Sequence, residues 1–171
     1  MKKTLILFSL WVCIAAFTAA AQPPVTIYAY SQATTPGMIP VDESGKPLDS
    51  RKERINYFIY AAFPDNYALK FDGIWIRGQG HRVQTHVVES TPVVITNNDI
   101  PAQPVKTVLV PATRRRVISI QPLSQSPITV RAAWFRDMTR RNELVVSYFY
   151  KGKKYFLPVR KFKVLPPVAA Q

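Results

Sequence analysis

Two histidines and a nearby glutamate are the residues whose types could bind a metal ion. His81, His86 and Glu89 offer imidazole and carboxylate donors, which zinc accepts. In an extended strand, residues an odd number of positions apart point to opposite faces. His81 and His86 are five positions apart, and His86 and Glu89 are three positions apart. The spacing therefore argues against a metal site, and the sequence predicts no metal and no other cofactor.

Hydrolytic chemistry lacks its usual sequence signals. A serine hydrolase of the common type places its nucleophile in a Gly-x-Ser-x-Gly turn, and the chain contains no such motif. The single cysteine, Cys13, lies in the N-terminal segment that we expect to be removed. Acidic residues such as Asp65 and Asp72 fall in or near turns, where turn chemistry explains them. The sequence therefore predicts no catalytic residue, and an envelope hydrolase whose acids converge in three dimensions is kept as the alternative.

Aromatic and cationic residues near the C-terminus form the most suggestive binding pattern. They lie on two runs separated by Lys151-Gly152, which predicts a hairpin with its cations at the tip. Such a combination could stack on sugars or bind acidic groups. A structural interpretation is favoured over this one, with the aromatics in the core and the lysines protecting an edge strand. The candidate binding residues are Arg114, Arg115, Arg116, Tyr148, Tyr150, Lys151, Lys153, Lys154 and Tyr155.

The N-terminus is typical of a signal peptide. Lys2 and Lys3 precede an apolar run, and Ala19-Ala20-Ala21 supplies the small residues that signal peptidase reads. We expect cleavage after Ala21, with residues 22–171 forming one exported domain in the periplasm or outside the cell. A lipid anchor at Cys13 is the less favoured alternative, because Trp11 and Val12 stand where small residues are needed. No transmembrane segment is expected in the mature chain.

Charge is concentrated in the second half of the chain. Residues 22–105 carry 7 basic and 8 acidic side chains, whereas residues 106–171 carry 14 basic and 2 acidic ones. Such asymmetry predicts a positive field over one region of the surface, unless it serves only solubility. The densest clusters are residues 114–116, 140–141, 151–154 and 160–163. Export argues against a nucleic acid partner and favours an anionic envelope component or another protein.

Short β-branched and aromatic runs punctuated by proline, glycine and asparagine predict an all-β fold. Residues 55–63 fit either a strand or a helix, and we favour a strand that pairs with the next one through the turn at 64–66. A strand is also predicted at 128–135, with at most one helical turn at 136–142. Residues 31–54 predict a long loop, and a frayed tail is predicted from residue 166.

These patterns favour an immunoglobulin-like β-sandwich of about eight to ten short antiparallel strands, with a small β-barrel as the alternative. The functional hypothesis is a non-enzymatic binding or accessory module of the cell envelope. It engages an anionic partner through its basic C-terminal half. A small structural subunit that pairs its sheet with a partner is a further hypothesis, which a long uncovered edge strand would support.

Overall fold

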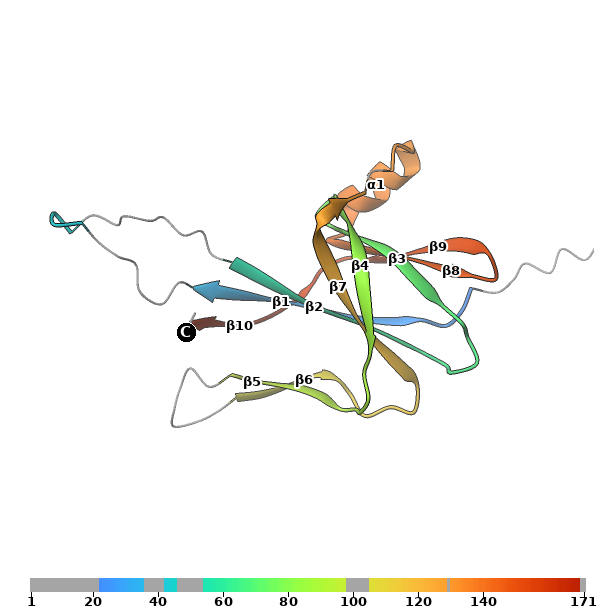
Figure 1. Ribbon diagram of the computed structural model, residues 1–171, viewed down its shortest axis with the longest axis horizontal. Coiled ribbons are helices and arrows are strands. Elements are labelled where there is room, and N and C mark those ends of the chain that lie inside the picture. The colour runs from blue at the N-terminus through green and yellow to red at the C-terminus, as the bar shows by residue number, and fades with distance from the viewer. Residues whose placement is uncertain (1–21, 36–41, 46–53, 98–104, 129, 170–171) are drawn as a thin grey trace, which may run out of the picture.

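The computed structural model describes residues 22–35, 42–45, 54–97, 105–128 and 130–169 (Figure 1). The predicted signal peptide and most of the predicted loop at 31–54 lie outside these residues. The described residues form ten strands and one helix. The strands of the first half are β1 (Thr26–Thr35), β2 (Arg54–Phe63), β3 (Lys70–Ile76), β4 (Gln79–Val87) and β5 (Val93–Asn97). The second half contains β6 (Val105–Val110), β7 (Arg116–Pro127), α1 (Ala133–Arg141), β8 (Leu144–Tyr150), β9 (Lys153–Val159) and β10 (Lys163–Ala169).

Eight of the strands form one curled mixed sheet in the order β10-β1-β2-β7-β4-β3-β8-β9. Its neighbouring strands are antiparallel except for β1 and β10, which run parallel. β5 and β6 form a separate two-stranded sheet. The prediction of an all-β fold is confirmed, and the arrangement is consistent with a sandwich or a half-barrel. The expectation of antiparallel pairing throughout is wrong at β1 and β10, because β10 returns from β9 to the opposite edge of the sheet.

The concave face of the large sheet encloses the main hydrophobic core. Alternate residues of the strands point to this face, as the period of two in a strand requires. Phe162, in the short connection between β9 and β10, closes the core against Tyr57 with ring centroids 5.0 Å apart. The fully or nearly fully buried members include Ile59, Ala61, Phe63, Ile74, Ile120, Leu144, Val146 and Tyr148.

Two further layers cover the outer face of the sheet at different places (Figure 1). The β5–β6 pair packs on β1 and β10, where the hydroxyl of Tyr30 donates a hydrogen bond to the carbonyl oxygen of Leu109 at 2.7 Å. The helix α1 packs on β3, β8 and β9 through Phe135. As a result β3 is covered on both faces, and the adjacent residues Ile74 and Trp75 are both buried.

The two hairpins nearest the helix share one kind of turn. Arg77 and Gly78 connect β3 to β4 with φ values of 48° and 84°, and Lys151 and Gly152 connect β8 to β9 with 47° and 74°. Positive φ at both central residues is the geometry that matches the twist of a two-residue hairpin. Each turn therefore places a basic residue at the end of its hairpin.

Several predicted elements are confirmed and others are corrected. Residues 55–63 form a strand, as predicted, and β3 contains a bulge between Phe71 and Gly73. The strand predicted at 128–135 is wrong, because α1 begins at Ala133. Phe135 is the residue that this helix buries against the sheet. The turn at 64–66 does not produce a β2–β3 hairpin, since β2 pairs with β1 and β7. β10 also continues to Ala169, past the start of the predicted tail, and β1 continues to Thr35, into the first residues of the loop predicted at 31–54.

Candidate functional site

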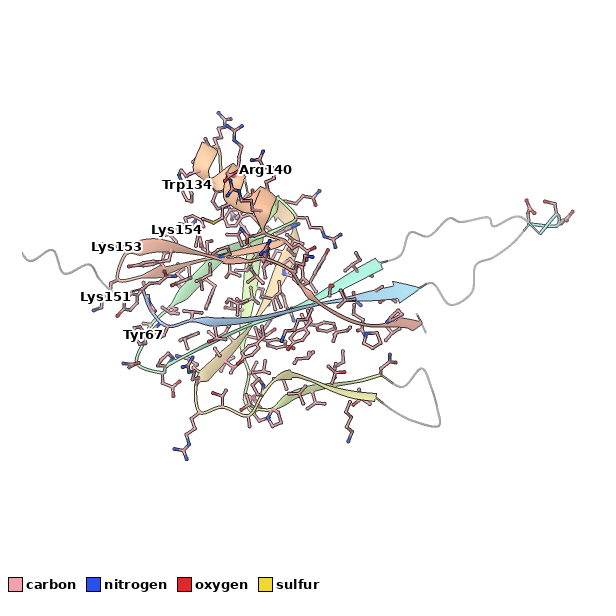
Figure 2. The ribbon with its side chains drawn as sticks, turned by 180° about the vertical axis from the view of Figure 1, so that it is seen from behind. Tyr67, Trp134, Arg140, Lys151, Lys153 and Lys154 are labelled. Atoms are coloured by element: carbon pink, nitrogen blue, oxygen red, sulfur yellow. The ribbon has the colours of Figure 1, made fainter. Side chains whose placement is uncertain are left out.

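The lysines predicted to bind lie at the β8–β9 turn. We call Lys151, Lys153 and Lys154 the lysine tip, and all three are exposed (Figure 2). The Lys154 ammonium is paired with the Asp72 carboxylate, with 2.5 Å between Nζ and Oδ2. Lys151 lies over the ring of Tyr150, with 5.3 Å from Nζ to the ring centroid. The structure thus keeps these cations near one another on a protruding turn, with one of them already bound to an acid.

The tyrosines predicted to bind with these lysines belong largely to the core. Tyr148 is fully buried and stacks on Tyr155 across the hairpin, with ring centroids 5.5 Å apart. Burial raises the pKa of the Tyr148 phenol, while a hydrogen bond from the Gln22 side chain lowers it in part. Tyr150 and Tyr155 are half-buried against the same core. Tyr148 is therefore inaccessible to a ligand, as the structural interpretation of these aromatics predicts.

Arg114, Arg115 and Arg116 lie at the start of β7, which β4 and β3 separate from β8 in the sheet. They line a small depression of about 190 Å³ together with Asp65 and Glu89. Arg115 also donates a hydrogen bond from Nη1 to Oγ1 of Thr26 at 3.3 Å. The two carboxylates offset much of the positive charge here, so this cluster is a weaker candidate for binding an anion.

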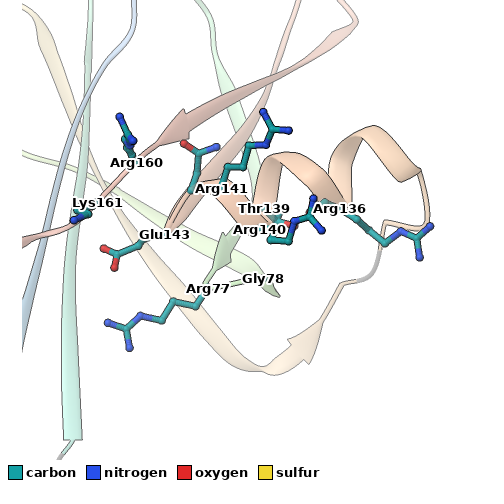
Figure 3. Close-up of a pocket in the computed structure, with 10 residues that line it drawn as sticks. Arg77, Gly78, Arg136, Thr139, Arg140, Arg141, Glu143, Arg160 and Lys161 are labelled. Atoms are coloured by element: carbon teal, nitrogen blue, oxygen red, sulfur yellow. The ribbon is translucent and has the colours of Figure 1, made fainter.

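A second concentration of cations surrounds a concave surface at the other end of β8 from the lysine tip (Figure 3). We call this site the arginine pocket, and its volume is about 590 Å³. The pocket is lined by Arg77, Gly78, Arg136, Thr139, Arg140, Arg141, Asn142, Glu143, Arg160 and Lys161. Since β8 has seven residues, the pocket and the lysine tip are about 20 Å apart along the strand.

Backbone hydrogen bonds around Glu143 bring the lining segments together. The N–H of Arg77 donates to the carbonyl oxygen of Glu143 at 2.8 Å, and the N–H of Glu143 donates to that of Arg160 at 3.2 Å. The Glu143 carboxylate accepts the N–H of Phe162 at 2.8 Å. Glu143 thereby joins the β3–β4 turn, the start of β8 and the connection after β9. These hydrogen bonds hold together the backbone segments that carry Arg77, Arg160 and Lys161.

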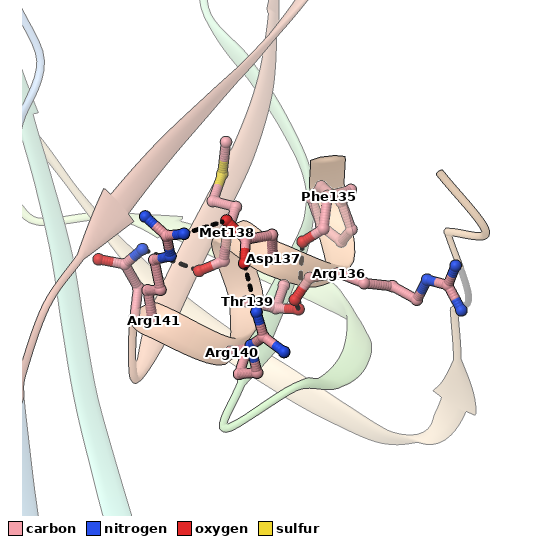
Figure 4. Close-up of polar contacts among 8 residues, drawn as sticks. Phe135, Arg136, Asp137, Met138, Thr139, Arg140 and Arg141 are labelled. Carbon is pink, nitrogen blue, oxygen red and sulfur yellow. Dashed lines mark hydrogen bonds and ion pairs between the residues drawn. The ribbon is translucent and has the colours of Figure 1, made fainter. Parts of the chain in front are cut away.

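The helix α1 supplies three more arginines, and its C-terminal end faces the pocket. Polar side chains satisfy carbonyl groups of its last turns: Thr139 Oγ1 donates to the Phe135 oxygen at 3.2 Å, and Asn142 Nδ2 donates to the Met138 oxygen at 2.8 Å (Figure 4). Arginines in the last turn also interact favourably with the helix dipole. The helix therefore ends at the pocket with Arg140 and Arg141 in place.

Acidic partners neutralise part of this charge. Asp137 pairs with Arg140 at 2.6 Å and with Arg141 at 3.0 Å, in contacts that are largely exposed. Within the described part of the chain, no ion pair involves the other four cations of the pocket, which are Arg77, Arg136, Arg160 and Lys161. Six cations against Glu143 and Asp137 leave the site positive.

Guanidinium groups determine what this site can do chemically. A guanidinium offers a planar fork of N–H donors that matches phosphate and carboxylate oxygens in pairs. Five arginines and one lysine line this concavity, with Arg136 directed to its outer boundary, and such a set suits an oxyanion that accepts several hydrogen bonds. The described residues contain no group of three or more histidines, cysteines, aspartates or glutamates placed to hold a metal ion.

Sequence reasoning found this site only in part. Residues 140–141 and 160–163 stand out as charge clusters, but Arg77 and Arg136 lie alone in the sequence, and the fold brings them to the others. The position of Arg77 had a usable signal. It precedes Gly78 in a hairpin turn, where its side chain must project beyond the sheet.

Comparison with known proteins gives no family assignment: no family model, curated protein or solved structure matches the chain. Among the described residues, no helix has the length and apolar character needed to cross a membrane.

Proposed function

We propose that the chain is an exported, non-enzymatic binding module of the cell envelope that takes an anionic group of its partner in the arginine pocket. One observation carries the proposal: cations from the β3–β4 turn, α1 and the connection after β9 converge on a single concavity. A surface kept basic for solubility alone has no need of such convergence. The predicted signal peptide supports a partner in the envelope, such as a phosphorylated or acidic glycolipid or glycan.

The carboxylates near the pocket support binding more than catalysis. Glu143 accepts a backbone N–H, and Asp137 bridges two arginines. Both groups therefore have structural partners instead of facing a vacant position where a substrate bond could be attacked. The hydrolase alternative gains no specific support from this arrangement.

The edge strands of the large sheet disfavour a role as a subunit that adds its sheet to a partner. β9 carries Lys153, Lys154 and Pro158, and β10 carries Pro166 and Pro167. Proline has no N–H to donate to a neighbouring strand, and lysine on an edge opposes pairing with another sheet. These residues support a module that binds through side chains.

The proposal is tested by titrating residues 22–171 with pyrophosphate and measuring the heat of binding by calorimetry. The titration is made at low ionic strength and again at about 0.15 M salt. We expect binding at low salt that weakens as exposed charges are screened. Native lipopolysaccharide should bind better than the same material stripped of its phosphates. Absence of pyrophosphate binding at low salt, or equal binding of both lipopolysaccharide samples, would overturn the proposal.

A further inference from the structure

A second pocket adjoins the arginine pocket and differs from it in character. Its volume is about 460 Å³, and it shares Gly78, Arg136 and Thr139 with the arginine pocket. Its distinctive wall is apolar, formed by Trp75, Phe135, Ile128 and Val130. We call it the apolar pocket. The shared residues make the two pockets neighbours around one end of α1.

The apolar wall follows from how α1 covers the sheet. Trp75 points to the outer face of β3 and meets Phe135 edge to face, with ring centroids 4.7 Å apart. The segment before the helix is tied to the sheet by a hydrogen bond from the N–H of Ile128 to the carbonyl oxygen of Gly80 at 3.1 Å. A Cβ atom at Gly80 would collide with the Ile128 carbonyl oxygen, so glycine permits this close approach.

Arg136 lies at the boundary between the two pockets. Figure 3 shows its side chain extending away from Arg77 and Arg160, toward the segment that precedes α1. Thr139, one turn further along the same helix, also contributes to both linings. A ligand occupying both pockets would therefore pass from a cationic environment to an apolar one across a polar boundary.

We infer that the natural ligand is an anionic amphiphile, with a phosphate or carboxylate head in the arginine pocket and an acyl or aromatic body in the apolar pocket. This inference rests on the proposed function and specifies its ligand class. Apolar surface gains free energy when it leaves water, and a head held by arginines directs that surface into the neighbouring pocket. A fully hydrated anion such as a bare sugar phosphate would leave the apolar pocket without a matching group.

A series of alkyl phosphates of increasing chain length, from methyl to octyl, tests the inference against inorganic phosphate as the reference. Each methylene that becomes fully buried should raise affinity by about fourfold, until the apolar pocket is full. Val130→Asn should flatten this gain while inorganic phosphate binds as before. Val164→Asn is the matched control, because Val164 is 81% exposed on β10 and lines neither pocket.

Fluorescence gives a readout that needs no change to the apolar pocket. Residues 22–171 contain two tryptophans, so Trp134→Phe leaves Trp75 as the reporter in its wall. An octyl phosphate brominated at the end of its chain should quench Trp75, whereas bromide ion at equal concentration should not. Quenching by phosphatidic acid vesicles with brominated acyl chains would indicate a lipid as the source, and quenching by the soluble amphiphile alone would indicate a free metabolite.

The outcomes separate this inference from the proposed function. Equal affinity for methyl and octyl phosphate, with inorganic phosphate still bound, would overturn the amphiphile and leave the anion-binding function standing. A chain-length gain that survives Val130→Asn, without quenching of Trp75, would also overturn it. Failure of pyrophosphate to bind at low salt would instead overturn the proposed function.

Discussion

The lysine tip and the arginine pocket lie at opposite ends of β8, and both are rich in cations. At the tip, charges adjacent in sequence spread over a protruding turn, and Lys154 is paired with Asp72. At the pocket, charges distant in sequence surround a concavity of about 590 Å³. Density of charge along a chain is therefore a poor guide to a site. A ligand is held where several donors reach it together, and this depends on how the fold brings segments into contact.

The largest expected effect is on stability. It distinguishes aromatic residues of the core from residues that contact a ligand at the lysine tip. Tyr148→Ala should lower the free energy of unfolding by about 3–5 kcal/mol, because it removes a fully buried ring and leaves a cavity. Tyr150→Ala, at a half-buried neighbour, should have less than half that effect. Denaturant unfolding measures both. A Tyr148→Ala protein with unchanged stability and lost anion binding would contradict the placement of this ring.

A smaller effect is expected from the ion pair beside the tip. Lys154→Glu should lower stability by about 1 kcal/mol, since it breaks the contact with Asp72 and sets two carboxylates together. Lys151→Glu and Lys153→Glu introduce the same charge change without that contact, and should shift the unfolding midpoint by less. Equal destabilisation by all three reversals would show that the Asp72 pair has no special role.

The smallest predicted effect concerns the acid that competes for the arginines of the pocket. Asp137→Asn should tighten pyrophosphate binding by about two- to threefold, because Arg140 and Arg141 lose their shared partner. Asp65→Asn removes the same charge near Arg114–Arg116 and should leave the affinity unchanged. Calorimetric titration compares the two variants. An equal gain from both would mean that only net charge matters.

The sequence was informative where local patterns decide the structure. The Lys151-Gly152 turn and the strand at 55–63 both follow from residue types within a few positions. The helix at 133–141 was missed because Trp134 and Phe135 give a short apolar pair that suits a strand equally well. Its amphipathic pattern becomes evident only once Phe135 and Met138 are seen to share a face on β3 and β8.

The candidate site was less predictable because its geometry depends on long-range pairing. Arg77, Glu143 and Arg160 meet through backbone hydrogen bonds between segments that are far apart in the chain. No periodic pattern in the sequence indicates that these segments are in contact. The parallel pairing of β1 with β10 is of the same kind, since it depends on where the chain returns after β9. Charge clustering could locate four of the six cations, but the concavity that they line depends on the fold.

Two matched double variants test the central claim most directly. The first variant combines Arg140→Gln with Arg160→Gln in the arginine pocket. The second combines Lys151→Gln with Lys153→Gln at the lysine tip. Each variant removes two exposed positive charges. Each is titrated with pyrophosphate at low salt, after its melting temperature is shown to match that of the unaltered chain. The account predicts a loss of about tenfold or more for the pocket pair, because charge-assisted hydrogen bonds are lost, and less than about twofold for the tip pair. Equal losses from both pairs would contradict it, because the protein would then bind anions through net charge alone.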